Sequence, residues 1–286
     1  MKRILTTAVL LAASLFLVAC GGGREEEYTP MPPVETQPSP PELMIGGEAT
    51  SRATEYDLRV LFVGNSFIFT NNLPQIFADL AASGGHNVYV YDVSEGGMAL
   101  IYHADSRDPD GVNTLAAIND PSIQWDYVIL QEQSARPILD LPSFERGARQ
   151  LSETVRQVGA EPAFFMTWAM INGVDDLDFD AANLLKELAY EDVAEQNNAL
   201  LLPVGTVWYY IVTYVIMEHD DVNWALSLWD ASNGMHPSYM GSYLAATVFY
   251  AAIFNESPVG LAHSDNIHHY DAEFIQAFVE WFFELD

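Results

Sequence analysis

The segment that decides the fold is residues 58–66, Leu-Arg-Val-Leu-Phe-Val-Gly-Asn-Ser, a short apolar run that ends in a glycine turn and a serine. Short apolar runs bounded by turn residues are typical of strands buried on both faces of a parallel sheet. We therefore predict a strand over 58–64. Similar runs predict further strands at 88–93, 126–131, 162–168 and 200–204.

Segments with helical spacing separate or follow these runs, at 72–83, 144–158, 181–197, 239–254 and 272–284. Strands that alternate with helices indicate βαβ units, whose parallel strands are covered by helices on both faces. The predicted fold class is α/β: a single flavodoxin-like, three-layer domain with a parallel sheet of about five strands. In such sheets the ligand site lies at the carboxyl ends of the strands.

The amino-terminal residues indicate export. Lys2 and Arg3 precede an apolar run over 4–18, which has the length of a signal-peptide core and is too short to span a bilayer. The run ends in Leu-Val-Ala-Cys, which resembles the lipobox of bacterial lipoproteins and places the chain's single cysteine, Cys20, at the lipidated position. We predict a signal peptide over 1–19 and a lipid anchor on Cys20; an ordinary cleaved signal is the alternative.

Residues 20–56 are rich in Gly, Glu and Pro and predict a disordered tether between the lipid and a folded domain over 57–286. The predicted location is the extracytoplasmic face of the cell envelope, with the membrane contacted through the lipid alone. The formal net charge of −29 makes nucleic acid a poor partner, because phosphate backbones repel such a surface.

Polar residues with catalytic chemistry follow the predicted strands. Ser66 comes directly after the first strand, and Gly96-Gly97 follows the second with a turn that can present backbone N–H groups. Gln131 and Gln133 follow the third. Near the carboxyl terminus, residues 230–238 read Asp-Ala-Ser-Asn-Gly-Met-His-Pro-Ser and lead into Gly-Ser-Tyr-Leu-Ala-Ala at 241–246.

This spaced set resembles the SGNH, or GDSL-type, hydrolases. It is most similar to a bacterial branch whose four sequence blocks are GNSF, GG, LQxQS and HPSxxGSYLAA. The resemblance implies that Ser66 is the nucleophile and that His236 is its general base, since histidine exchanges protons near neutral pH. It also implies an oxyanion hole made by the backbone N–H groups of Ser66 and of Gly96 or Gly97, together with a side-chain amide.

Two positions depart from the usual family pattern. The amide donor is commonly an asparagine, and here we favour Gln131, with Gln133 as the second choice. The group that orients the histidine is usually an aspartate three residues earlier, which is Asn233 in this chain. Asp230, three residues further back, is an equal candidate, and a backbone carbonyl is a third.

Other patterns have simpler explanations. Asp176, Asp178, Asp180 and Glu187 resemble a calcium loop but lack its glycine, and acidic residues also favour the start of a helix. The cluster at 263–271, which includes His263, Asp265, His268, His269 and Asp271, suits a surface loop. We expect no metal and no cofactor. The segment 207–214 is aromatic and predicts a helix. Together with Trp168, Trp224 and Trp229 it could line a platform for a sugar or acyl group, but packing in the core explains such aromatic residues more often.

The function predicted by the resemblance is a lipid-anchored serine esterase that removes acetyl or similar small acyl groups from carbohydrates or other small esters. Lysophospholipase and arylesterase activities are alternatives within this class. The competing hypothesis is a catalytically weak or inactive surface lipoprotein that binds glycans with the same cleft, because an asparagine stands at the usual acid position.

Overall fold

The computed structural model describes residues 56–285. The predicted signal peptide, the lipidated Cys20 and nearly all of the predicted tether lie outside these described residues. No helix within 56–285 is long and apolar enough to cross a membrane.

The sheet is parallel throughout and has the order β2-β1-β3-β4-β5. Its strands are β1 (Leu58–Val63), β2 (Val88–Asp92), β3 (Tyr127–Leu130), β4 (Glu161–Phe165) and β5 (Leu200–Leu202). This is the strand order of flavodoxin-like sheets. It confirms the predicted α/β class and all five predicted strands, each of which ends one to three residues earlier than its apolar run.

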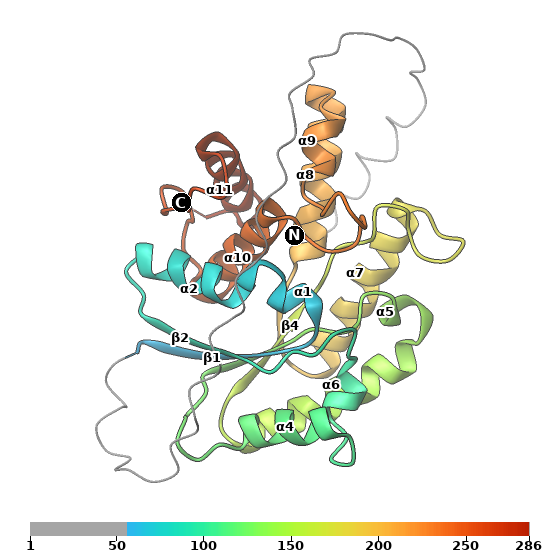
Figure 1. Ribbon diagram of the computed structural model, residues 1–286, viewed down its shortest axis with the longest axis vertical. Coiled ribbons are helices and arrows are strands. Elements are labelled where there is room, and N and C mark those ends of the chain that lie inside the picture. Colours follow the sequence, from blue (N-terminus) through green and yellow to red (C-terminus); the bar gives the residue numbers. More distant parts are fainter. Residues whose placement is uncertain (1–55, 286) are drawn as a thin grey trace. The chain divides into compact units, whose positions relative to one another are not determined.

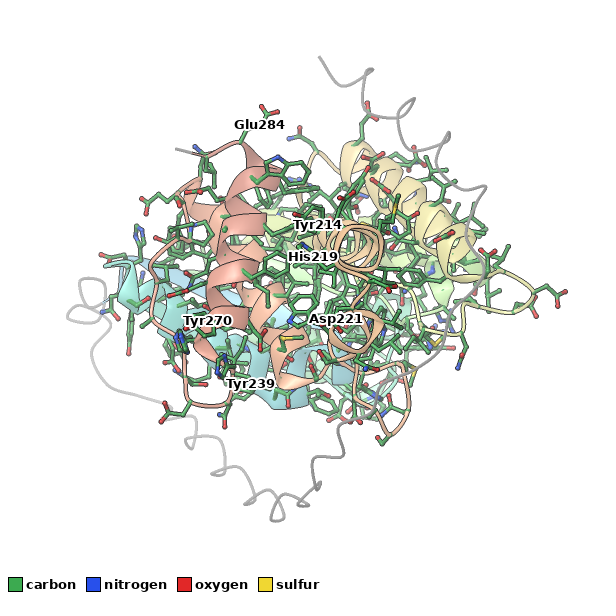
Figure 2. All side chains as sticks on the ribbon, turned by 90° about the horizontal axis from the view of Figure 1, so that it is seen from above. Tyr214, His219, Asp221, Tyr239, Tyr270 and Glu284 are labelled. Carbon is green, nitrogen blue, oxygen red and sulfur yellow. The ribbon has the colours of Figure 1, made fainter. Side chains whose placement is uncertain are left out.

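One face of the sheet packs against α2 (Leu73–Ser83), α8 (Val204–His219), α10 (Tyr239–Phe254) and α11 (His269–Phe283) (Figure 1). Val60 and Phe62 of β1 point into this core, as the period of two along a strand requires. Tyr214 on α8 (Figure 2) is exposed and contacts the rings of Phe274 and Phe278 on α11 at 6.3 and 5.8 Å between ring centroids. Val207, Trp208, Ile211 and Val212 of the same segment are buried in this core, so the aromatic segment forms a helix packed on it.

The opposite face, which carries Leu61 and Val63 of β1, packs against α3 (Leu100–His103), α4 (Pro109–Ile118), α6 (Leu141–Gln157) and α7 (Phe179–Gln196). Shorter elements connect the layers: α1 (Ser66–Phe69), the 3₁₀ turn η3 (Thr70–Asn72), α5 (Arg136–Leu139) and α9 (Val222–Leu226). The sheet is thus enclosed on both faces, which explains why its strands are apolar without alternation.

Side-chain caps account for several helix starts. Asp178 accepts a hydrogen bond from Ala181 N at 2.9 Å and caps α7, and Asp180 lies in its first turn. Ser238 accepts from Gly241 N at 3.2 Å and caps α10. The acidic run near residue 178 therefore has a structural role at a helix start. Within residues 56–285, no group of three or more histidine, cysteine or acidic side chains is placed to hold a metal ion.

Candidate active site

The turn after β1 is held in a narrow space at the carboxyl edge of the sheet. A Cβ on Gly64 would lie 2.5 Å from Gln131 Oε1, so any larger residue would force the turn or its neighbours to shift. The next residue, Asn65, is buried, and its side chain accepts from Phe67 N at 3.2 Å and donates to Met98 O at 2.9 Å. Asn65 thereby caps α1 and ties the turn to the loop after β2, which places Ser66 as the first residue of α1.

Ser66 meets His236 across the site. The imidazole Nε2 of His236 lies 2.8 Å from Ser66 Oγ, although the two residues are 170 positions apart in the chain. Both side chains are partly buried. This is the separation of a nucleophile from a general base that accepts its proton. The structure thus brings together the two residues that the sequence predicts as nucleophile and base.

The loop that carries His236 is fixed by its backbone. Asn233 Oδ1 accepts hydrogen bonds from Met235 N at 2.9 Å and from His236 N at 2.8 Å. The carbonyl oxygen of His236 accepts from Asp230 N at 2.8 Å. Asn233 therefore shapes the turn before the histidine through main-chain contacts, an ordinary use of an asparagine side chain.

Three neighbouring carbonyl groups of this loop are held from other elements. Trp168 Nε1 donates to Met235 O at 3.0 Å, and Ile171 N donates to Gly234 O at 3.1 Å. Asn71 Nδ2 donates to Pro237 O at 3.1 Å. The ring of Phe67 stacks on the imidazole of His236 at 5.6 Å between centroids. The segments after β1 and β4 together fix the position of the histidine.

Asp230 lies near the histidine, and its carboxylate is held mainly by Ser232. Its carboxylate accepts a hydrogen bond from Ser232 N at 2.7 Å, and neither it nor the Asn233 side chain hydrogen-bonds the imidazole. Hydrogen bonds from Ser232, and secondarily attraction to His236, lower the pKa of Asp230. The choice of orienting group remains a prediction, and the geometry favours Asp230 as the electrostatic partner because Asn233 is neutral.

The turn at Gly96-Gly97 is exposed, and Gly97 has a positive φ of 69°. Glu95 N, just before it, donates to Gly64 O at 3.1 Å and anchors the turn beside the nucleophile. No atom lies within 4 Å of a Cβ built on either glycine, so the space above the turn is open. Backbone N–H groups of this turn remain the predicted oxyanion donors.

The two glutamines after β3 differ in their surroundings. Gln131 is fully buried; its Oε1 accepts from Asn65 N at 2.9 Å, and its Nε2 donates to the carbonyl of Glu132. Gln131 therefore holds the nucleophile turn and does not present its amide to the cleft in this structure. Gln133 is partly buried; its Oε1 accepts hydrogen bonds from Ala135 N at 3.0 Å and Arg136 N at 3.2 Å, and its Nε2 donates to Ser134 Oγ at 3.3 Å. Gln133, the second choice, is thus the less enclosed of the two glutamines, and the identity of the amide donor stays a prediction.

Several residues that support the site were not predicted from the sequence. His103 is buried and places Nε2 2.8 Å from Gly64 O and Nδ1 2.7 Å from Thr114 Oγ1; burial lowers its pKa. Lys186 is also buried and donates to Trp168 O at 2.7 Å, and burial lowers its pKa to about 7. Glu132, a spacer in the LQxQS pattern, is fully buried beside Gln131. A lone histidine or lysine in a helical segment gives no sequence signal for such a role.

Two predicted aromatic residues, Trp168 and Trp229, are core residues. Trp168 stacks on Trp208 at 4.0 Å between centroids, and Trp208 meets Trp229 edge-on at 5.0 Å. All three are buried. Core packing thus explains them, and Trp168 extends this stack to Phe67 beside the histidine, at 5.0 Å.

Comparison with known proteins shows which class of protein this chain resembles in fold. No protein-family model matches the chain, and no curated protein is similar to it in sequence. Among solved structures, a candidate SGNH hydrolase from Slackia heliotrinireducens is 28% identical over 68% of this chain and 98% of its own, with a TM-score of 0.55. The structural neighbours of the chain thus include SGNH/GDSL hydrolases, and its α/β domain has their fold.

Two further structures agree in fold. A DUF4886 family protein from Bacteroides uniformis is 18% identical over 78% of this chain and 93% of its own, with a TM-score of 0.64. A variant of an acetyl-xylooligosaccharide esterase from Geobacillus is 14% identical over 69% of this chain and 94% of its own, with a TM-score of 0.51. At these identities the likeness is one of fold.

Proposed function

We propose that this protein is a serine ester hydrolase that removes acetyl or similar small acyl groups from carbohydrates. The observation that carries the proposal is the 2.8 Å contact between Ser66 Oγ and His236 Nε2 at the carboxyl edge of the sheet. The SGNH/GDSL hydrolases among the structural neighbours support the same reaction class.

The reaction follows from this pair. Ser66 Oγ attacks the acyl carbonyl carbon while His236 Nε2 takes the hydroxyl proton, and N–H groups of the Gly96-Gly97 turn and of Ser66 stabilise the oxyanion. The imidazolium returns the proton to the departing alcohol, which leaves an acyl-serine. Water then attacks the acyl-serine with His236 again as base, and releases the carboxylic acid and the free serine.

A shallow surface cavity near the histidine loop is a candidate place for part of a carbohydrate substrate. The cavity has a volume of about 300 Å³. Its lining combines the polar residues Ser227, Ser238, Tyr239, Asn266, His268 and Asp271 with the apolar residues Met240 and Ile267. Ser238 is two residues from His236, which puts the two Cα atoms within about 7 Å of each other. The acetyl-xylooligosaccharide esterase of the same fold makes acetylated sugars the first substrates to test.

The test is ester hydrolysis by residues 20–286 carrying Cys20→Ala, with p-nitrophenyl acetate, butyrate and octanoate and with acetylated xylooligosaccharides. Ser66→Ala is expected to lower turnover by about a thousandfold or more, and His236→Ala similarly. Ser122→Ala alters an exposed serine after α4 that contacts only Asp120, and it is expected to keep full activity. Parental turnover no faster than that of Ser66→Ala on every ester would contradict the proposal.

A glycan-binding protein without turnover is the second candidate. The observation that favours it is the missing carboxylate hydrogen bond to His236, since Asp230 and Asn233 bond elsewhere. Binding of glycans with equal affinity by the parent and by Ser66→Ala, with no hydrolysis by either, would establish this function instead.

We also propose that the protein is held at the extracytoplasmic face of the cell envelope by a lipid on Cys20. The sequence pattern before Cys20 supports this proposal, and two acyl chains are sufficient for stable anchoring. In a bacterial host, the full chain is expected in the membrane fraction and Cys20→Ser in the soluble fraction. Equal membrane association of both would argue against a lipid anchor.

A further inference from the structure

Glu132 is a fully buried carboxylate at the carboxyl end of β3. Its Oε1 accepts hydrogen bonds from Gln133 N at 2.6 Å and from Leu100 N at 3.3 Å. Its Oε2 is buried and has no hydrogen-bond partner. A buried carboxylate with an unpartnered oxygen is costly to a fold, so its presence beside a candidate active site calls for an explanation.

The two N–H groups that Glu132 binds belong to different loops. Leu100 begins α3 and follows the Gly96-Gly97 turn by three residues, while Gln133 belongs to the segment after β3. One carboxylate oxygen therefore joins the loop of the predicted backbone oxyanion donors to the loop of the predicted amide donor. The loop after β2 is also bound by Asn65, whose side chain donates to Met98 O at 2.9 Å.

The charge of Glu132 changes near neutral pH. Burial raises the pKa of Glu132 to about 7, while the N–H groups of Gln133 and Leu100 and the positive charge of Arg136 oppose this rise and Asp140 adds to it. Tyr190 on α7 faces Glu132 and receives a hydrogen bond of 3.3 Å from its backbone N–H. His103, on α3, bonds instead to Gly64 and Thr114.

We propose that Glu132 is a positioning residue for the oxyanion side of the active site, and that the ionised carboxylate holds the Gly96-Gly97 loop and the Gln133 loop more firmly than the protonated acid does. An ionised acceptor makes stronger hydrogen bonds with N–H donors than a neutral one. The catalytic part of this proposal rests on the proposed function; the structural part does not.

The structural part is tested by NMR on residues 20–286 carrying Cys20→Ala. The backbone amide signals of Leu100 and Gln133 are expected to shift between pH 5.5 and 8.5 with a common midpoint, and those of Gly96 and Gly97 are expected to follow. The same titration should persist in His236→Ala, which separates Glu132 from the imidazole, and should disappear in Glu132→Gln. Amides of Leu100 and Gln133 that do not titrate together, or that titrate unchanged in Glu132→Gln, would overturn the proposal. The parental and His236→Ala titrations decide the matter even if Glu132→Gln does not fold.

The catalytic part is tested by kinetics on p-nitrophenyl acetate. Glu132→Gln keeps the shape and the acceptor oxygen but removes the charge, so kcat above pH 8 is expected to fall about tenfold with little change in KM. Its loss of kcat should shrink towards pH 6, where the parental carboxyl is also neutral. Glu187→Gln is the matched control, because Glu187 on α7 also has its pKa raised by burial and contacts Thr206 instead of the site. Parallel pH profiles of kcat in the parent and Glu132→Gln would overturn the catalytic part. A parent without turnover would instead contradict the proposed function, and the amide titration would then decide the structural part of this inference.

Discussion

The indole Nε1 of Trp168 donates a hydrogen bond of 3.0 Å to the carbonyl oxygen of Met235, the residue immediately before His236. Trp168 follows β4 and is buried, whereas the histidine loop comes from the carboxyl-terminal part of the chain. This bond connects a rigid element to the loop that must present an imidazole to Ser66. Positioning by a packed side chain replaces part of the restraint that a carboxylate partner usually supplies to a catalytic histidine.

We predict that Trp168→Phe lowers kcat five- to tenfold, because loss of one such hydrogen bond costs about 1 kcal/mol and frees the loop to move. KM for p-nitrophenyl acetate should change by less than about twofold, since Trp168 is buried and does not line the open side of the site. Trp125→Phe is the control, because Trp125 is equally buried and its indole N–H bonds to Ala117 O in the opposite layer. Equal losses of kcat in both variants would mean that the effect is one of general stability.

The roles of Asp230 and Asn233 predict opposite responses to charge substitutions. Asp230→Asn removes the negative charge that attracts the imidazolium, so kcat should fall about tenfold near neutral pH. Asn233→Asp keeps the Oδ1 acceptor for Met235 N and His236 N, so it should keep activity within about threefold of the parent. Steady-state kinetics of both variants distinguish the candidates: an unchanged kcat in Asp230→Asn, together with a raised kcat in Asn233→Asp, would identify position 233 as the orienting one.

The sheet was predictable because its signal is local. The inner strands β1, β3 and β4 are largely buried, and the partly buried edge strands β2 and β5 are also short and mostly apolar, so each strand stands out in the sequence as a short apolar run. The strand ends differ from prediction by one to three residues because apolar residues such as Trp168 continue into buried loops after the strand. The helix α4, which begins at Pro109 with Asp108 as its cap, was missed because its sequence is mostly small and polar.

The sequence predicts those residues of the candidate site that lie in short distinctive patterns. It does not predict the residues that reach the site only through the packing of the fold. Ser66 and His236 each lie in a distinctive block, and the structure brings them together. The role of Gln131 could not be read from the sequence, because its amide is directed by the close approach of Asn65. Lys186 is an ordinary residue in a helical pattern, and only the packed structure shows that it is buried and donates to Trp168 O.

The close packing of Gly64 against Gln131 gives a prediction about the nucleophile turn. Gly64→Ala would place a Cβ 2.5 Å from Gln131 Oε1 and 2.7 Å from Ile68 Cδ1, so the turn must shift. We expect a loss of about 1–3 kcal/mol in the free energy of unfolding and at least a tenfold loss of kcat. Gly84→Ala is a matched control, because its Cβ would meet Tyr250 Oη at 2.3 Å, away from the site. Urea unfolding and kinetics of both variants decide the point: full kcat in Gly64→Ala would show that the turn tolerates the change.

Lys186 predicts an unusual pH dependence of stability. Burial lowers its pKa from the ordinary 10.5 to about 7 in the folded protein. Between these values the unfolded chain binds more protons than the folded one, so the free energy of unfolding should rise with pH. From pH 7 to 9.5 this group alone should add about 3 kcal/mol, while below about pH 6, where both states bind the proton, its contribution is constant.

Lys186→Met removes this titration and keeps the length of the side chain, so its free energy of unfolding should be nearly independent of pH between 7 and 9.5. The variant also loses the hydrogen bond from Nζ to Trp168 O, at 2.7 Å, so part of the gain at pH 7 is offset by an unpaired carbonyl. The comparison therefore uses the change of the free energy of unfolding with pH, and not its value at one pH. Urea unfolding of the parent, Lys186→Met and Glu187→Gln measures that slope, and Glu187→Gln, one residue along α7, should keep the parental one. A parental stability that stays flat or falls between pH 7 and 9.5 would show that Lys186 keeps its proton in the folded state throughout this range.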